Sequence, residues 1–425
     1  MRQETAPNVE LGLKQNLSQF ILLALVNVAV GGVVGLERTT TPLVGKDVFH
    51  LSSTLAIFSF IIAFGVTKAI TDLLTGPLTT RYSKRNILIV GWIIGAPVPF
   101  ILAYSTHWWM IIAANIALGL NQGLTWSMTV NMKIDLVGPN QRGLATGVNE
   151  AAGYGAVGAT ALVTGYLASH FGLRPAPEII GAIFVLLGFA LSLTVRDTAR
   201  HVAHETRGSN WKAQSPQGVT LNQGQTSFVA IFWSTTWSDR RLRGASQAGF
   251  INNLNDAVTW GVFPLLFTSH GLGLVAIGLI KGVYPLLWGL GQIPAGLASD
   301  RIGRKPLIVL GMAIQSGALL LAIALLKWPL MAGLVSSITL GVGTAMVYPT
   351  LIASVSDSVA PTIRSKSLGV YRFWRDLGYA AGALGAGVIS SFAGLNISIL
   401  IAAGLTALSS LLAFMWLPST TQQGH

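Results

Sequence analysis

The sequence predicts an all-α membrane protein in which twelve transmembrane helices form two six-helix, pseudo-symmetric halves. Three observations lead to this fold class. Only 10% of the 425 residues are charged and 52% are hydrophobic, whereas a soluble globular protein carries about 25% charged residues. Twelve apolar stretches are long enough to span a bilayer, and patterns in the first half return in the second half. So few charges cannot cover a water-exposed surface, which excludes the soluble, disordered and collagen-like classes.

The expected spans come from the apolar stretches, because a transmembrane helix needs about 20 mostly apolar residues. They are residues 17–36, 52–75, 86–104, 108–131, 143–169, 176–195, 244–268, 273–298, 306–326, 329–355, 365–392 and 395–417. The polar segment 196–243, with its ten charged residues, is predicted to be a mobile linker between the halves. The halves are then residues 17–195 and 244–417, with tails at 1–16 and 418–425.

The basic residues predict the orientation of the chain. With the N-terminus inside, the loops on the inner side hold nineteen Lys and Arg, among them Lys133, Arg142 and Arg364, while the outer loops hold three. Loops rich in Lys and Arg remain in the cytoplasm. We therefore expect both termini in the cytoplasm, in a bacterial-type inner membrane. The net charge of +12 then belongs to loops, and nucleic acid is excluded as a partner.

Enzymatic chemistry finds no support in the sequence. The chain contains no cysteine, so disulfide frameworks, zinc-finger motifs and thiol catalysts are excluded. No phosphate-binding loop, metal-ligand cluster or nucleophile triad stands out. We expect a protein that is not an enzyme and that uses no cofactor and no metal. The first span follows a polar stretch, so we expect it to be retained and not cleaved as a signal peptide.

Two patterns repeat at an offset of about 220 residues. The segment from Gly76 to Arg85 (GPLTTRYSKR) aligns with that from Gly296 to Lys305 (GLASDRIGRK). Separately, the pattern Asp135-x3-Pro-x2-Arg142-x4-Gly aligns with Asp357-x3-Pro-x2-Arg364-x4-Gly. A long repeat of this kind in a membrane protein suggests two halves related by an axis along the membrane normal, with a binding site between them.

With these motifs the chain resembles the major facilitator superfamily. The residues that carry the resemblance are Asp72, Gly76, Arg81, Lys84 and Arg85 after the second span, and Gly296, Asp300, Arg301, Arg304 and Lys305 after the eighth. The resemblance covers residues 17–417 and implies secondary transport by alternating access. Spans 1, 4, 7 and 10 would line the cavity, and spans 2, 5, 8 and 11 would form the seam between the halves. The implied partners are a small-molecule substrate and the lipid bilayer, and we expect a monomer.

Two departures separate the chain from the drug/proton antiporters of this family. Those proteins usually carry an arginine early in the fourth span, where this chain has Asn115. They also carry a Gly-Pro signature in the fifth span, which here runs from Gly147 to Gly165 without proline. Both departures weaken the drug-exporter interpretation without removing it.

Charged residues inside the second and eleventh spans predict ion pairs across one seam. A charge at the centre of a bilayer costs at least about 2.5–3.5 kcal/mol, so each requires a partner or a role. At about 1.5 Å per residue, Asp72 lies at the depth of Arg372, and Lys68 lies at the depth of Asp376. The two pairs would form either a static tie or a gate that breaks during transport.

Two buried carboxylates are candidates for proton coupling. Glu150, on the fifth span, faces Gln292 by the repeat alignment and has no obvious cation, so burial favours its protonated form. A glutamate that binds backbone or lines a water-filled cleft is the alternative. Asp256, on the seventh span, lies near the midplane, where a functional role is favoured over a structural one.

Polar and aromatic residues on the predicted cavity helices are candidates for solute binding. Asn252, Asp256 and Trp260 fall on one face of the seventh span. The full set of cavity candidates is Asn27, Asn121, Gln122, Trp126, Asn131, Asn252, Asn255, Trp260, Tyr348 and Arg375. Such a lining suits a small polar or anionic solute, although the amides could equally form interhelical hydrogen bonds. A lipophilic, drug-like cation is the alternative solute, and a non-transporting sensor or assembly subunit is the alternative from another class.

Overall fold

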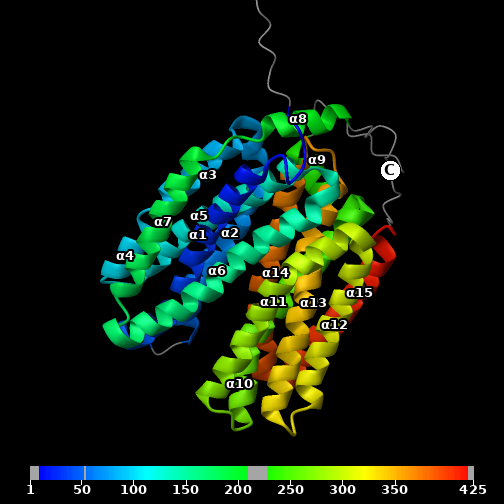
Figure 1. The fold of residues 1–425 in the computed structure, drawn as a ribbon. Coiled ribbons are helices and arrows are strands. Elements are labelled where there is room, and N and C mark those ends of the chain that lie inside the picture. Colours follow the sequence, from blue (N-terminus) through cyan, green and yellow to red (C-terminus); the bar gives the residue numbers. More distant parts are fainter. Residues whose placement is uncertain (1–8, 52–53, 209–226, 420–425) are drawn as a thin grey trace, which may run out of the picture.

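The computed structural model describes residues 9–51, 54–208 and 227–419, and every regular element in these residues is helical (Figure 1). The long helices of the first half are α1 (Leu17–Leu43), α2 (Thr54–Arg81), α3 (Lys84–Gly95), α4 (Val98–Tyr104), α5 (Trp108–Val137), α6 (Arg142–Phe171) and α7 (Ala176–Thr194). Those of the second half are α10 (Arg240–Ser269), α11 (Leu274–Ile302), α12 (Arg304–Ala324), α13 (Pro329–Asp357), α14 (Arg364–Ala393) and α15 (Leu395–Trp416).

The third expected span consists of two helices, α3 and α4, separated at Ala96 and Pro97. Proline has no N–H to donate and its ring clashes with the preceding turn, which interrupts a helix. Counted with this break, the described residues supply the twelve expected spans. Between the halves lie α8 (Ala199–Gly208), α9 (Phe228–Trp233) and a π-helical turn at Ser234–Ser238.

Several helices extend further than the apolar stretches predicted. α5 continues to Val137, beyond the expected end at residue 131, and α2 continues to Arg81, beyond residue 75. The apolar run marks only the part of a helix that faces lipid or core, whereas helical backbone continues into the charged loops. This error placed Lys133 in a loop, although it is buried within α5.

Seven of the described helical spans are apolar enough to cross a membrane by length and composition alone. The long helices that miss this criterion are α5, α6, α10, α11 and α14. Three of these, α6, α11 and α14, form the contacts between the halves, where α6 packs on α11 and α14 packs on α2. Their polar residues face protein, so hydropathy alone underestimates them as membrane spans.

The two halves meet most closely at one end of the bundle, which we call the basic face because it carries Arg81, Arg301 and α8. There the seam is backbone against backbone: a Cβ at Gly296 would clash with the carbonyl of Gly143, and one at Gly76 would clash with Lys366. Toward the other end, Cβ atoms built on the outer glycines of the seam helices (Gly155, Gly158, Gly282, Gly289) meet open space. The ribbons of the two halves also diverge away from α8 (Figure 1). The halves are therefore interlocked at the basic face and looser at the opposite face.

Candidate functional site

The α2–α14 seam brings five ionised side chains together. The Lys68 ammonium donates to Asp72 at 2.8 Å and, across the seam, to Asp376. Arg375 binds the same Asp376 carboxylate through Nε at 2.8 Å and Nη2 at 2.7 Å. The predicted pair between Lys68 and Asp376 is therefore present and joins the two halves.

The predicted pair between Asp72 and Arg372 is present, and the hydroxyl of Ser127 bridges the two side chains. Nη1 of Arg372 donates to Oγ of Ser127 at 2.8 Å, and Ser127 donates to Asp72 at 2.5 Å. The direct separation of Arg372 from Asp72 is 3.9 Å. Nε and Nη2 of Arg372 are buried without a hydrogen-bond partner. With three cations against two carboxylates, Arg372 is the least neutralised member of the cluster.

Glu150 in the α6–α11 seam is buried and hydrogen-bonded within its own half. Its Oε1 accepts from Trp126 Nε1 at 3.0 Å and from Asn149 Nδ2 at 2.9 Å, while Oε2 is buried without a partner. Asn149 in turn accepts from Lys133 at 2.6 Å. The expectation that Glu150 has no cation nearby is therefore corrected: Lys133, which the sequence assigned to a loop, is connected to it through one amide.

Among the described residues, the same seam has no ion pair in its interior at the depth of Asp72. Its residue there is Gln292, whose amide oxygen and nitrogen are buried without a hydrogen-bond partner. Nearer the basic face, Asp300 accepts from the backbone N–H groups of Gly143 and Leu144, each at 2.8 Å. These N–H groups belong to the first turn of α6, where a carboxylate satisfies free donors and complements the helix dipole. Asp300 of the second half thus caps a helix of the first.

The two Asp-x6-Arg repeats pair with each other at the basic face. Arg142, at the start of α6, binds Asp357 at 2.7 Å. Arg364, at the start of α14, binds Asp135 at 3.2 Å. The arginine of each half therefore meets the aspartate of the other half, so the duplicated motif ties the halves together.

The segment between the halves adds a further carboxylate to this tie. Glu205, on α8, is buried, and its Oε1 accepts from Arg142 and, at 2.6 Å, from Arg364. This part of the predicted linker is therefore a docked helix. The prediction of a mobile linker over 196–243 is therefore corrected for α8 and for α9 with its π-helical turn, while residues 209–226 lie outside the described residues.

The loop residues of the two motif copies have unequal surroundings. Lys84 binds Asp135, and Arg304 binds Asp357 at 2.9 Å and Asp300 at 2.6 Å. Arg85 donates to the Leu193 carbonyl at 2.7 Å, and the Lys305 ammonium lies 4.6 Å from the centre of the Phe414 ring. Arg81 and Arg301 are exposed.

Aromatic side chains from both halves meet where the seam loosens. The hydroxyls of Tyr154 and Tyr348 are 2.9 Å apart across the seam. The Tyr154 ring centre lies 4.1 Å from that of Trp288 and 5.1 Å from that of Trp126. The guanidinium of Arg375 lies 5.2 Å from the Tyr348 ring centre. We call Trp126, Tyr154, Trp288 and Tyr348 the central aromatic cluster, with Glu150 on one side of it and Arg375 on the other.

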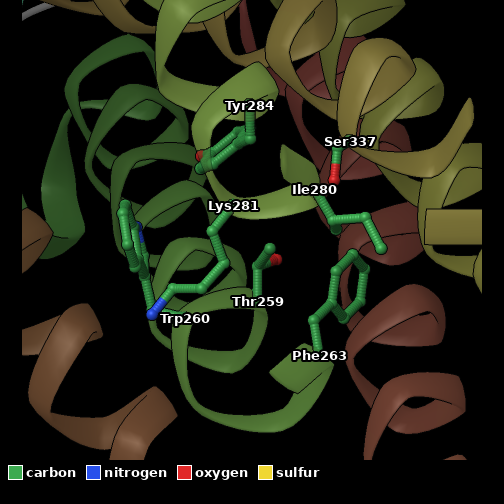
Figure 2. Close-up of a pocket in the computed structure, with 7 residues that line it drawn as sticks. All are labelled: Thr259, Trp260, Phe263, Ile280, Lys281, Tyr284 and Ser337. Carbon is green, nitrogen blue, oxygen red and sulfur yellow. The ribbon is translucent and has the colours of Figure 1, made fainter. Parts of the chain in front are cut away.

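A second group lies further from the basic face, on α10 and α11. Trp260 Nε1 donates to Asp256 at 2.9 Å, and the Tyr284 hydroxyl lies beside both Asp256 and Thr344. The Lys281 ammonium sits 4.9 Å from the centre of the Trp260 ring. Figure 2 shows Lys281 extended toward that ring at the edge of a small hollow. The predicted association of Asp256 with Trp260 is therefore present.

Most of the asparagine and glutamine candidates bind neighbouring helices. Asn27 donates to Asn149 O at 2.6 Å, Asn121 to Gly91 O at 2.8 Å, and Gln122 to Val30 O at 3.0 Å. Asn252 accepts from Gln315 at 2.8 Å, and Asn255 donates to the same side chain at 3.1 Å. For these five the interhelical alternative describes the geometry, and their role in a cavity lining stays a prediction. Asn131 Oδ1 is buried without a hydrogen-bond partner.

Several residues of the site were missed by sequence reasoning. The repeat alignment already contained Asp135, Arg142, Asp357 and Arg364, so their mutual pairing could have been proposed from it. Ser127, Asn149, Tyr154 and Trp288 carried no such signal, because uncharged residues are common in membrane helices. Glu205 lay in a segment interpreted as linker.

Comparison with known proteins identifies the family. The model of the Major Facilitator Superfamily matches residues 17–246 and 245–424, and the chain belongs to this family. It is accordingly a multi-pass integral membrane transporter that binds small-molecule substrates within the membrane, and not an enzyme.

The curated relatives are distant. An uncharacterized MFS-type transporter of Bacillus subtilis, YddS, is 25% identical over 87% of this chain and 84% of its own length. The class C tetracycline resistance protein of Escherichia coli is 25% identical over 81% of this chain and 83% of its own length. The Escherichia coli inner membrane transport protein YajR is 34% identical, but the match spans only 25% of this chain and 24% of YajR.

Solved structures share the fold. The proton:xylose symporter XylE has a TM-score of 0.75 at 16% identity, covering 95% of this chain and 96% of XylE. The human organic anion transporter MFSD10 has a TM-score of 0.67 at 18% identity, covering 94% of this chain and 99% of that protein. At these identities the likeness shows the twelve-helix, two-half fold alone.

Proposed function

We propose that this chain is a secondary active transporter that moves a small polar or anionic solute by alternating access and couples this movement to protons. In this proposal the basic face lies in the cytoplasm, and a single chain is the functional unit. The observation that carries the proposal is the position of Glu150. This carboxylate is buried beside the central aromatic cluster, at the junction of the two halves. A solute that separates Tyr154 from Tyr348 also changes the surroundings of Trp126, which packs on Tyr154 and donates a hydrogen bond to Glu150. The Glu150 carboxylate can therefore exchange a proton when the junction opens.

The alternation follows from the unequal ends of the seam. Ion pairs and the Asp300 cap close the basic face, while the glycines of the opposite half of the seam face open space. We assign this arrangement to the outward-facing state. Opening toward the cytoplasm requires that the Arg142–Asp357 and Arg364–Asp135 pairs separate and that the other end closes.

A drug/proton antiporter is the second candidate. The similarity to tetracycline resistance proteins favours it, and an aromatic cluster can hold a lipophilic solute. Asn115 and the proline-free α6 argue against it. The proton:xylose symporter, with the same fold, supports proton coupling for a polar solute.

Proton movement in proteoliposomes tests the proposal. Candidate solutes from several classes (sugars, organic acids, amino acids, lipophilic cations) are added, and the internal pH is recorded. We expect a solute-dependent proton flux that Glu150→Gln and Asp256→Asn abolish while solute exchange continues. Glu178→Gln, which changes a buried carboxylate in the first turn of α7, is the control and should keep the flux. Full gradient-driven accumulation by both site variants would disprove the coupling role, and a flux with lipophilic cations alone would favour the antiporter.

A further inference from the structure

We propose that Lys281, Trp260 and Ser337 form an outer binding site for the carboxylate of an organic acid with a flat apolar body. The proposal rests on the proposed function, since it names the class of solute that the transporter takes. Its basis is an embedded cation whose charge the protein does not neutralise, placed beside a hollow with an unsatisfied hydroxyl.

Lys281 differs from the other embedded cations of the described residues. Lys68 and Arg375 contact carboxylates directly, and Arg372 reaches one through Ser127. The contact that the structure gives for the Lys281 ammonium is the Trp260 ring, and within the described residues no carboxylate forms an ion pair with it. A lysine inside a membrane protein normally pairs with an acid or extends to the surface. Lys281 instead turns inward, so its charge is available to an anion.

The Trp260 ring holds that ammonium in place. Its N–H is bonded to Asp256 at 2.9 Å, which fixes the plane of the indole and directs one face toward Lys281. A cation over an indole gains about 0.5–2 kcal/mol, but the quadrupole of the ring does not cancel the charge. An acid that binds here gains an ion pair and finds a flat apolar surface beside it.

The hollow beside Lys281 supplies the remaining chemistry. Its lining residues are Thr259, Trp260, Phe263, Ile280, Lys281, Tyr284 and Ser337. Ser337, from α13, projects toward it in Figure 2; the residue is 1% exposed, and its buried hydroxyl has no hydrogen-bond partner. The hollow measures about 10 Å³, room for about one water-sized group, so it admits one oxygen of a carboxylate while the body of the solute lies outside. A cation, a free hydroxyl and aromatic walls are complementary to a carboxylate on an apolar ring.

An aromatic path leads from this site to the junction of the halves. Tyr284 stacks on Trp288 at 5.8 Å, and Trp288 contacts Tyr154 at 4.1 Å. Beyond them lies Arg375, over the Tyr348 ring. An acid held first by Lys281 would therefore pass along aromatic faces toward a second cation. The first half offers no matching cation, because the counterpart of Lys281 by the repeat offset is Ile61.

Equilibrium dialysis of the purified chain with labelled benzoate tests the site. The chain is held in phosphatidylcholine nanodiscs, and benzamide and benzylamine serve as neutral and cationic probes of the same shape. We expect benzoate to bind and the other two not to bind. Lys281→Gln should weaken benzoate binding about a thousandfold, the effect of one charge pair at about 4 Å and an effective dielectric of about 20, whereas Lys281→Arg should preserve it. Ser337→Ala should weaken it less, because one neutral hydrogen bond is lost. Lys327→Gln, at an exposed lysine beyond α12, is the matched control and should change nothing.

The outcomes separate this inference from the proposed function. Unchanged benzoate binding by Lys281→Gln, absence of benzoate binding, or equal binding of benzamide would overturn the site. Loss of benzoate when phosphatidylglycerol replaces part of the lipid would also overturn it, because Lys281 would then hold a lipid headgroup. Proton-coupled flux of another solute class in the proteoliposome assay, unaffected by Lys281→Gln, would leave the proposed function standing without this site.

Discussion

The two seams between the halves are related by the internal repeat, yet they are held by different forces. In the α2–α14 seam, Lys68, Asp72, Arg372, Arg375 and Asp376 form a buried charge cluster. In the α6–α11 seam, glycine backbones touch and Asp300 caps the first turn of α6. The residue that corresponds to Asp300 in the other copy is Thr80, whose hydroxyl donates to Pro77 O in its own helix.

The difference shows how duplicated halves can specialise. A buried ion pair is strong only while both partners stay in place, so the charge cluster resists small displacements and can change sharply when one member is neutralised. The described residues of the α6–α11 seam are held together by backbone packing and by one capped helix, with no ion pair in the interior. The stability of this seam therefore depends on how closely the two helix surfaces fit. One seam is therefore held by charge, and the other by fitted backbone surfaces with the single buried carboxylate Glu150 beside them.

Neutralising one carboxylate of the charge cluster should have the largest effect. Asp376→Asn leaves Lys68 and Arg375 without their shared acceptor, and breaking a buried pair in this way costs about 3–5 kcal/mol. We expect a lower thermal midpoint and loss of transport. Adding Lys68→Met should restore part of the stability, because the two residues are coupled. In the other seam, Gln292→Met removes two unpaired buried polar atoms and should be neutral or stabilising. Additive effects of the two charge substitutions would show that no coupling exists.

A methyl group in the fitted seam should come next. Gly296→Ala places a Cβ against the carbonyl of Gly143, and overpacking of this kind costs about 1–3 kcal/mol. The cost falls on the state that is closed at the basic face, so that face should open more often. A single cysteine introduced at Ser356, which is buried there, should react faster with a thiol reagent, and the chain has no other cysteine. Gly158→Ala, on the open part of α6, is the control; equal labelling of both variants would contradict the prediction.

Removing the linker carboxylate should have a smaller effect on closure. Glu205→Gln takes away the anion that Arg142 and Arg364 share, and hydrogen bonds to charged groups are worth about 1.5–3 kcal/mol. The cross pairs with Asp357 and Asp135 remain, so part of the tie persists. We expect faster amide exchange in α8, measured by mass spectrometry, with a modest rise in labelling at Ser356→Cys. His204→Gln, at an exposed position on the same helix, should leave exchange unchanged. Protection of α8 in the Glu205 variant would show that the helix docks by other contacts.

The smallest effect concerns pH. Burial lowers the pKa of His201 on α8, and the nearby Asp135 opposes the shift. Nε2 faces the side-chain amide oxygen Oδ1 of Asn16 at 3.2 Å, while Nδ1 is buried without a partner, so a second ring proton would be unsatisfied. A folded-state pKa below the unfolded value of about 6.5 means that docking of α8 is fully stable above that pH and weakens as the pH falls below it. The protection of the α8 amides, measured relative to their intrinsic exchange rate at each pH, should therefore fall as the pH drops below about 6.5, and His201→Gln should remove the dependence. An unchanged pH profile in that variant would assign the effect to another group.

The sequence was sufficient for the fold and for one seam. Hydropathy located the spans, and matched depths on two helices predicted the Lys68–Asp376 pair, because the rise per residue of a helix is fixed. It was insufficient where a side chain's direction around its helix decided the contact. Asn252 turns to Gln315 on α12 although it shares a face with Asp256, and Lys133 points into the core from a stretch that looked like a loop. Glu205 illustrates a third limit, because a short docked helix in a polar segment has no apolar run to reveal it.

The cross-pairing of Arg142 with Asp357 and of Arg364 with Asp135 has a consequence for the origin of the chain. In each pair the arginine of one half meets the aspartate of the other half, so the two halves use the same surface. Such a contact is called isologous and is the kind found in a two-fold symmetric dimer. A single six-helix protein carrying one Asp-x6-Arg motif could make both pairs by associating with itself. In such a dimer every substitution appears twice and the two seams are forced to be identical. A single chain is free of that constraint, and Glu205, which occurs once and contacts both arginines, is a residue that breaks the two-fold relation.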